Sequence, residues 1–276
     1  MKNEDITFVI TTFKSEKIIK DCLNTLPESS PKIIIENSGN EVMKVDLEKN
    51  YKNLECFIMS ENLGYGRANN LGISKCKTNF AFILNPDAKL PQNSLREILN
   101  LLEGQDFCIA SPIEAIEQSK KFKKKKYLEV EFVRGFAMLL NLKKINFGLF
   151  DENIFLYLEE IDLCKRAIKN KQKILLLNIK IDHAGGSSHG DRTNLEMEKS
   201  RNWHWMWSKF YYNKKHFGFF FALIKTFPNL LSSIIKVVIY SIIKNDLKKN
   251  IYSMRLSGLI ASYKNKDSYY RPLIKD

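Results

Sequence analysis

The sequence predicts an α/β protein, with a mostly parallel, doubly wound sheet followed by a helical C-terminal extension. Three observations indicate this class. Short β-branched and aromatic runs alternate with helical patterns, polar clusters end those runs, and the composition changes after residue 194. A chain of 276 residues with 44% hydrophobic and 27% charged residues has enough apolar material for a folded core. We therefore predict two parts, residues 1–194 and residues 195–276.

The first strand is predicted at Ile6–Phe13, where β-branched and aromatic residues follow one another without a break. A helix should follow, because Ser15 can cap it, apolar residues recur at helical spacing and Pro27 ends it. Alternation of strands with helices indicates parallel βαβ units. The other predicted strands are Lys32–Glu36, Leu54–Met59, Phe80–Leu84, Phe107–Pro112, Val130–Leu140 and Lys173–Ile181, with helices at Asn69–Lys75 and from Glu159 onward.

Polar side chains occur at the ends of three of these predicted strands. The segments are Thr11–Phe13, Glu36–Ser38 and Asn85–Asp87. In a doubly wound sheet the carboxyl ends of parallel strands lie at one edge, and ligands bind outside that edge. The three polar clusters are therefore expected to converge on one site.

The tripeptide Asn85-Pro86-Asp87 is the sharpest single signal in the sequence. A proline that halts a buried strand places the following carboxylate at the sheet edge. Mg²⁺ in such sites is commonly bound by one or two carboxylates together with substrate phosphates. A lone Asp after a strand is more often a turn former, so the metal interpretation depends on other segments.

Two further segments carry groups suited to chemistry. Glu159, Glu160 and Asp162 are crowded at the start of a predicted helix, where acids complement the helix dipole or supply a general base. His183 comes just after a predicted strand and before two glycines, a pattern that permits metal ligation and close approach to a diphosphate. The glycine-rich segment 62–72 lacks the G-x-G-x-x-G spacing after the first strand, which argues against a dinucleotide oxidoreductase.

Seven segments in this order resemble the family 2 glycosyltransferases of the A-type fold, and are most similar to the rhamnosyltransferase-like branch. The resemblance covers about residues 5–190. It implies a nucleotide-diphospho-sugar transferase fold, a nucleoside-diphosphate sugar donor, a divalent cation (Mg²⁺ or Mn²⁺) and inversion at the anomeric carbon. The segments are VITTF, IIIENSG, ENLGYGRANNLGI, FILNPDA, VRGFAMLL, GLFDENIFLYLEEIDLCKR and HAGGSS.

The resemblance also implies roles for individual residues. Asp87 and His183 would bind the metal. Glu160 would be the catalytic base, with Glu159 and Asp162 as nearby alternatives. Asn85 stands where the family's Asp-x-Asp motif has its first acid, and Glu36 stands where family members commonly carry Asp. The residues that would bind or border the donor are Thr11, Phe13, Glu36, Asn37, Asn62, Gly64, Arg67, Asn70 and Asn85.

The net charge of +13 is concentrated in two places. Residues 195–276 hold 15 Lys and Arg against five Asp and Glu, and a lysine run lies at Lys120, Lys121 and Lys123–Lys126. An anionic partner would bind at these two basic regions. Anionic lipid is favoured over nucleic acid, for which no recognised motif appears. A solvated loop is the default interpretation of the lysine run.

The most apolar stretch is Phe217–Ile243, which Lys225, Pro228 and Lys236 interrupt. We predict two interfacial or packed helices here rather than one spanning helix. Association with a membrane surface is favoured over packing against the main domain or a homodimer contact. Nearby, three tryptophans are suited to the lipid headgroup level, to an acceptor sugar or to a packed core: Trp203, Trp205 and Trp207.

The N-terminus shows no apolar signal region, and the five cysteines are odd in number and scattered. Both observations predict a cytoplasmic protein, on the inner face of the membrane. The expected function is transfer of a sugar, L-rhamnose foremost, to a hydroxyl of a glycan or lipid-linked glycan in cell-surface polysaccharide synthesis. A catalytically inactive, membrane-associated nucleotide-sugar-binding scaffold is the alternative.

Overall fold

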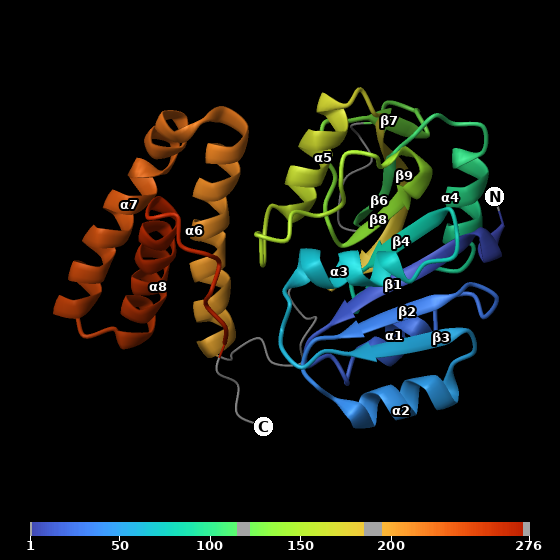
Figure 1. Cartoon of the computed structure of the whole chain (residues 1–276), viewed down its shortest axis with the longest axis horizontal. Helices are drawn as coiled ribbons and strands as arrows, with labels where there is room; N and C mark the ends of the chain where they lie inside the picture. Colours follow the sequence, from blue (N-terminus) through green and yellow to red (C-terminus); the bar gives the residue numbers. More distant parts are fainter. Residues whose placement is uncertain (1, 115–121, 185–194, 273–276) are drawn as a thin grey trace. The chain divides into compact units, whose positions relative to one another are not determined.

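The structure is a computed structural model that describes residues 2–114, 122–184 and 195–272. The chain forms two compact units (Figure 1). The first comprises Met1–Asp151 and Glu160–Arg192, and the second comprises Glu152–Glu159 and Thr193–Asp276. The chain therefore passes into the second unit for eight residues and returns to the first before its C-terminal part begins.

The first unit is built on a nine-stranded sheet in the described residues, with the order β3-β2-β1-β4-β8-β6-β9-β5 and with β7 paired to β9 (Figure 1). Strands β3, β2, β1 and β4 are parallel, β8 runs against β4 and β6, and β6 is parallel to β9. The carboxyl ends of β1, β2, β4, β6 and β9 consequently lie at one edge. The strands are β1 (Ile6–Thr12), β2 (Lys32–Glu36), β3 (Leu54–Ile58), β4 (Phe80–Leu84), β5 (Ala88–Lys89), β6 (Ile109–Glu114), β7 (Tyr127–Glu129), β8 (Ala137–Asn141) and β9 (Ile174–His183).

Helices cover both faces of this sheet because the central strands are apolar on both sides. Phe8 packs in one core cluster, whereas its neighbour Val9 packs in another with Leu163 and Cys164 of α5. The helices of this unit are α1 (Ile19–Leu23), α2 (Glu41–Asn50), α3 (Tyr65–Ser74), α4 (Ser94–Leu102) and α5 (Glu159–Lys169), with short 3₁₀ helices at Asn3–Asp5 and Leu142–Lys144.

The predicted fold class is confirmed, with several changes at element boundaries. The segment predicted as one strand at Val130–Leu140 is wrong in its first half, since β8 begins only at Ala137. Residues 130–136 instead connect β7 to β8. They run from Val130, whose N–H donates to the Ile174 carbonyl at the start of β9, to Phe136, whose carbonyl accepts from the Asn85 N–H at the carboxyl edge of the sheet. Strand β6 continues to Glu114, two residues beyond its predicted end, and α3 begins at Tyr65 rather than Asn69.

The second unit contains α6 (Leu195–Phe217), α7 (Phe219–Ile242) and α8 (Asp246–Tyr263) (Figure 1). Trp203 and Trp207 are buried in its core, which favours the packing interpretation for these two, while Trp205 is 39% exposed. The prediction of two separate helices around Pro228 is wrong, because α7 continues through this proline. The packing of α6 and α8 alongside α7 supports the continuous helix.

Candidate active site

Asp87 and His183 face each other at the carboxyl edge of the sheet. Asp87 follows β4, and His183 is the last residue of β9. The Oδ1 atom of Asp87 lies 3.3 Å from Nε2 of His183, and the Asn85 amide nitrogen lies 3.4 Å from the same Nε2. Both Asp87 and His183 are largely buried. Three residues that the sequence predicted for the site are thus brought together.

The spacing of this pair suits a hard divalent cation. Two neighbouring ligands of an octahedral Mg²⁺ at 2.0–2.1 Å stand about 3 Å apart. With a cation bound, Nε2 of His183 would lose its proton and present a lone pair to the ion, which would lie between Nε2 and the carboxylate of Asp87, while the Nδ1 proton would point to Glu114. The described residues contain no group of three His, Cys, Asp or Glu side chains that could hold a metal ion. Waters and substrate phosphates would have to complete such a site.

A set of residues absent from the sequence prediction orients His183. Glu114, at the end of β6, lies 2.8 Å from Nδ1 of His183 and forms an ion pair with Arg134. The ring of Phe136 stacks on the imidazole with centroids 4.7 Å apart. Burial lowers the pKa of His183, but its hydrogen bonds with Asp87 and Glu114 outweigh burial and raise the pKa above its ordinary value.

Glu160 lies beside the same loop. A Cβ atom placed on Gly135 would be 3.5 Å from Cβ and Cγ of Glu160, which is ordinary van der Waals contact, so the backbone of this glycine lies next to the glutamate side chain. The hydroxyl of Tyr65 donates a hydrogen bond of 2.7 Å to the Gly135 carbonyl. Burial raises the pKa of Glu160 despite two backbone hydrogen bonds that lower it. The loop residues Arg134, Gly135 and Phe136 therefore contact Glu114, Glu160 and His183 in turn.

The other two acids of the predicted catalytic cluster have different environments. Asp162 is fully buried and pairs with Arg166 at 2.8 Å. Arg166 also donates to the backbone carbonyls of residues 147–149, so this pair holds a loop of the first unit. Glu159 is buried at the first turn of α5 and is the last residue of the segment that belongs to the second unit.

The chain enters α5 through an unusual turn. Tyr157 and Leu158 have φ angles of 71° and 70°, the left-handed region that residues other than glycine rarely occupy. Helix α6 holds the preceding residues, since His204 stacks on Phe155 at 4.4 Å and the Ser208 hydroxyl donates to the Leu156 carbonyl at 2.8 Å. Two adjacent strained residues persist only where the surroundings enforce them, and such strain clusters at functional sites.

The predicted donor residues at the ends of β1 and β2 form a second polar group. Glu36 is fully buried, and its carboxylate accepts hydrogen bonds from the backbone N–H groups of Ser38 and Asn40 at 2.7–3.0 Å. The Asn37 amide donates to the Gly64 carbonyl at 3.4 Å. Glu36 thus shapes the loop after β2 and, through it, the position of Asn37.

Asn69 on α3 is a site residue that the sequence did not single out. Its Oδ1 accepts a hydrogen bond of 3.0 Å from the Thr11 hydroxyl. Its Nδ2 and the Oδ1 of Asn37 are buried and lack a hydrogen-bond partner in the part of the chain that the structure describes. A buried donor and a buried acceptor without partners are costly unless a ligand satisfies them. The only sequence signal was the asparagine pair in NLGYGRANNLG, of which the prediction took Asn70 alone.

The remaining predicted donor residues are more dispersed. The side-chain Oδ1 of Asn62 accepts a hydrogen bond of 2.9 Å from the Gly64 N–H. Gly64 itself precedes α3 with a φ angle of +82°. Asn70 exchanges two hydrogen bonds with the Phe150 backbone, at 2.9 and 3.0 Å. Phe13 is half-buried and Arg67 is exposed. The two glycines after His183, and Lys120 and Lys121 of the lysine run, lie outside the described residues.

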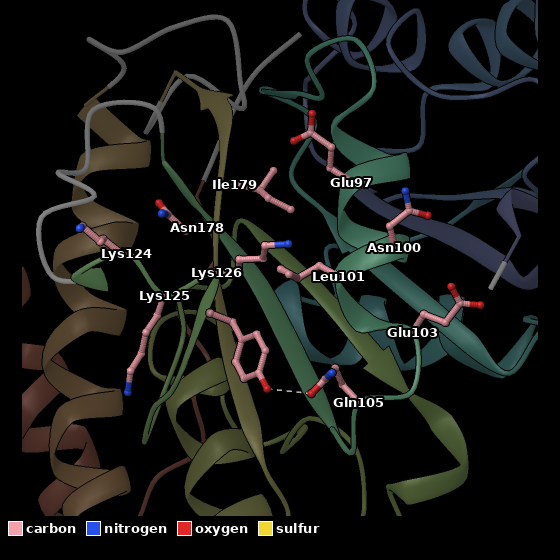
Figure 2. A pocket seen from close by; sticks show the side chains of 11 residues that line it. Glu97, Asn100, Leu101, Glu103, Gln105, Lys124, Lys125, Lys126, Asn178 and Ile179 are labelled. Atoms are coloured by element: carbon pink, nitrogen blue, oxygen red, sulfur yellow. Dashed lines mark hydrogen bonds between the residues drawn. The ribbon is translucent and has the colours of Figure 1, made fainter.

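A separate pocket of about 600 Å³ lies between α4, β7 and β9 (Figure 2). Three lysines and two glutamates line it, and the Tyr127 hydroxyl donates to the Gln105 side chain at 2.8 Å. None of the predicted site residues lines this pocket. The lining residues are Glu97, Asn100, Leu101, Glu103, Gln105, Lys124, Lys125, Lys126, Tyr127, Asn178 and Ile179.

Comparison with known proteins decides the family. Residues 7–163, more than half of the chain, match the family model described as glycosyl transferase family 2. The chain belongs to this family. The match begins in β1 and ends in α5, so this glycosyltransferase family 2 region includes the Asn-Pro-Asp segment and Glu160 but stops before His183. The predicted family is confirmed, and the rhamnosyltransferase-like branch stays a prediction.

A curated relative and several solved structures are similar to this family 2 chain. The low-salt glycan biosynthesis hexosyltransferase Agl10 of Haloferax volcanii is 22% identical over 191 residues, which cover 59% of this chain and 62% of Agl10. The chain thus spans less than two thirds of that relative. The mannosyltransferase PcManGT of Pyrobaculum calidifontis, in complex with GDP-Man and Mn²⁺, has a TM-score of 0.58 at 11% identity, over 95% of this chain and 88% of that one.

The S. aureus protein TarS, residues 1–349 in complex with UDP-GlcNAc, has a TM-score of 0.56 at 13% identity. The likeness covers 96% of this chain and 93% of the TarS chain. At such identities the two structural matches bear on the fold, which they support over nearly the whole chain.

Proposed function

We propose that this family 2 member is an inverting, metal-dependent glycosyltransferase that moves a sugar from a nucleoside-diphosphate donor to a hydroxyl of a glycan acceptor. The observation that carries the proposal is the loop of residues 134–136, which contacts both His183 and Glu160. Phe136 stacks on His183, and Gly135 packs against Glu160. A cation site beside a general base is what this reaction requires.

Glu160 acts as the base in this scheme. The acceptor hydroxyl loses its proton to the carboxylate as its oxygen attacks the anomeric carbon, and the bond from that carbon to the donor diphosphate breaks. One base is sufficient for a single displacement with inversion. The raised pKa of Glu160, caused by burial, strengthens it as a proton acceptor.

A bound Mg²⁺ or Mn²⁺ would stabilise the negative charge that develops on the departing diphosphate. Asp87 and His183 would hold the ion, with Asn85 beside them. The Asp87 carboxylate is a ligand type that both cations accept, whereas an imidazole ligand suits transition metals, so the pair favours Mn²⁺ over Mg²⁺. PcManGT is described in complex with Mn²⁺, which supports the use of a divalent ion on this fold.

The nucleoside part of the donor would lie over the ends of β1 and β2. Asn37 Oδ1 and Asn69 Nδ2 offer an acceptor and a donor there, a pair that suits the edge of a nucleobase. PcManGT and TarS are described with GDP-Man and UDP-GlcNAc respectively. L-Rhamnose is the first sugar to test here, and a lipid-linked glycan of cell-surface polysaccharide synthesis is the acceptor class, at the inner face of the cytoplasmic membrane.

Binding and turnover can be tested together with a panel of nucleoside-diphosphate sugars. A ligand that binds only the folded state stabilises it by about 2.7 kcal/mol at a concentration 100 times its Kd. We expect one donor with Mn²⁺ to raise the melting temperature of the full-length protein, and transfer to require Mn²⁺ or Mg²⁺. Stabilisation without transfer or hydrolysis would favour the inactive scaffold. Equal turnover in excess EDTA would contradict the metal role.

The Glu114 contact predicts a second result. Replacing Glu114 with Gln should weaken Mn²⁺ binding about 10- to 100-fold, since outer partners of metal-binding histidines have effects of this size. The exposed Glu129 on β7, changed to Gln, is the matched control. Titration of Mn²⁺ in the presence of nucleoside diphosphate measures the affinity without turnover. Equal Mn²⁺ affinity in the two variants would remove Glu114 from the site.

A further inference from the structure

Helix α7 carries most of its large apolar side chains on its exposed side, unlike a helix of a water-soluble domain. On the side packed inside the second unit the fully buried residues are small, Ala222, Thr226 and Ser233, and the larger Leu223 and Leu230 are only partly buried there. The three small residues recur at spacings of four and seven, which places them on one helix face. The Thr226 hydroxyl lies 2.9 Å from the Tyr263 hydroxyl of α8.

Further along α7, polar groups again point toward the neighbouring helices. Asn229 accepts a hydrogen bond of 2.8 Å from Lys209 of α6. Lys236 donates to the Tyr252 hydroxyl of α8 at 3.0 Å and lies over its ring. In water these groups would be expected outside and the apolar ones inside.

The opposite side of α7 is exposed and apolar over its full length. Phe220, Ile224 and Ile242 are 78%, 76% and 74% exposed. Phe227, Leu231 and Ile235 are also exposed and lie on the same side by helical spacing. We call this surface the α7 apolar face. Contiguous apolar patches of this extent mark contacts with membranes or with other proteins.

Among the described helices, α7 alone is long and apolar enough to cross a membrane, with a mean hydropathy of 1.5 over its most apolar window. The helices packed against α7 argue against a membrane crossing. The contacts of Thr226 with Tyr263 and of Lys236 with Tyr252 show that α8 runs antiparallel along α7. A crossing would carry Arg255 in the middle of α8 into the hydrocarbon, which is costly. A helix lying flat keeps the charged helices on the water side.

The distribution of charge around α7 favours an anionic membrane over a second copy of the chain as the binding partner of this face. Basic residues lie just before and just after α7, and within residues 205–266 the only acidic residue is Asp246. Two copies of the chain meeting through this face would bring these like charges together, whereas anionic lipid attracts them. The flanking residues are Lys214 and Lys215 before the helix and Lys244, Lys248 and Lys249 after it.

We propose that α7 lies in the plane of an anionic membrane surface, with the α7 apolar face among the acyl chains and the flanking lysines at the lipid phosphates. This inference specifies how the enzyme of the proposed function would reach the membrane. Only the lipid-linked acceptor is taken from the proposed function. A surface-bound unit of this kind would hold the enzyme at a lipid-linked acceptor without α7 crossing the membrane.

Vesicle flotation tests the binding surface. Full-length protein should float with vesicles of phosphatidylcholine and phosphatidylglycerol, and less with phosphatidylcholine alone or at high salt. The double variant Ile224→Glu/Ile235→Glu should remain at the bottom of the gradient. Val42→Glu on α2, where the side chain is 81% exposed, is the matched control and should float normally. Flotation of the double variant at the level of the control would overturn the proposal.

The orientation needs a second measurement. Single variants Lys215→Cys and Lys244→Cys, bound to the outside of sealed vesicles, should both react with a membrane-impermeant maleimide. Protection of one of them would indicate a spanning helix and overturn the flat arrangement. Sedimentation velocity without lipid should show a monomer. A stable dimer that the Ile224→Glu/Ile235→Glu variant dissociates would instead assign the face to a second copy.

Failure of this proposal and failure of the proposed function are distinguishable. Asp87→Asn should float like the unmodified protein, and Ile224→Glu/Ile235→Glu should still be stabilised by the nucleoside-diphosphate sugar with Mn²⁺. Loss of donor binding in the double variant would show that the substitutions disturb the fold, and the maleimide labelling of Lys215→Cys and Lys244→Cys would then decide between the flat and the spanning arrangement.

Discussion

Replacing Glu160 with Gln should lower the rate of sugar transfer by about 10²- to 10⁴-fold, the usual contribution of a general base. The amide has nearly the same size as the carboxylate, so the packing against Gly135 should survive. Donor binding should therefore remain, as measured by thermal stabilisation of the protein by the donor in the presence of Mn²⁺. The variant thus separates removal of the proton from recognition of the nucleotide.

The pH dependence of transfer gives an independent measurement. Burial raises the pKa of Glu160, so the carboxyl stays protonated to a higher pH than an ordinary glutamate. A protonated base cannot accept the acceptor's proton, and transfer should fall as the pH drops through this raised pKa. The residual activity of the Gln variant should lack that dependence.

The exposed Glu152, changed to Gln, is the control from the same segment. Its transfer rate should match that of the unmodified protein. If Glu160→Gln also transfers normally, the base is another group, and Glu159 becomes the first alternative because Asp162 is engaged by Arg166.

The part of the site formed by strand ends could be predicted from the sequence. Lys32–Glu36 and Phe80–Leu84 begin and end where they were expected, because β-branched and aromatic runs are bounded by Asn, Pro, Ser and Gly. Parallel pairing then places Glu36 and Asp87 at one edge without any knowledge of tertiary contacts. Local pattern and topology suffice for such positions.

The residues that orient the site could not be predicted in this way. Glu114 is 69 positions from His183, and the two meet because β6 pairs with β9. The loop of Arg134–Phe136 had the pattern of a strand, since its apolar residues continue into β8. Its role depends on where antiparallel β8 begins, and no short-range signal in the sequence specifies that position.

The second unit shows another limit of sequence patterns. A change of composition marked residue 194, but residues 152–159 also belong to this unit. Their aromatic and aliphatic side chains resemble any core segment, and only the contacts of Phe155 and Leu156 with α6 identify their place. A truncation at residue 195 would remove those contacts from the strained turn before Glu160. Membrane binding is therefore better tested with surface substitutions than by deletion.

Replacing Asp87 with Asn should abolish the thermal stabilisation of the protein by Mn²⁺ and lower the rate of sugar transfer about a hundredfold or more. A bound cation contributes several kcal/mol of charge stabilisation to the transition state, and each 1.4 kcal/mol corresponds to about a tenfold change in rate. The variant keeps the size of the side chain but replaces a carboxylate ligand by a neutral amide. Binding of Mn²⁺ measured by electron paramagnetic resonance, with nucleoside diphosphate present, reports the loss without turnover.

Asp182 provides the matched control for this variant. It precedes His183 on β9 and is exposed, and successive side chains of a strand point to opposite faces. Asp182→Asn should therefore bind Mn²⁺ and transfer sugar normally, although it removes the same charge a short distance away along the chain. Equal loss in both variants would indicate a general effect of net charge at this edge. Mn²⁺ binding that persists in Asp87→Asn would place the ion on other groups and contradict the pairing of Asp87 with His183 as its site.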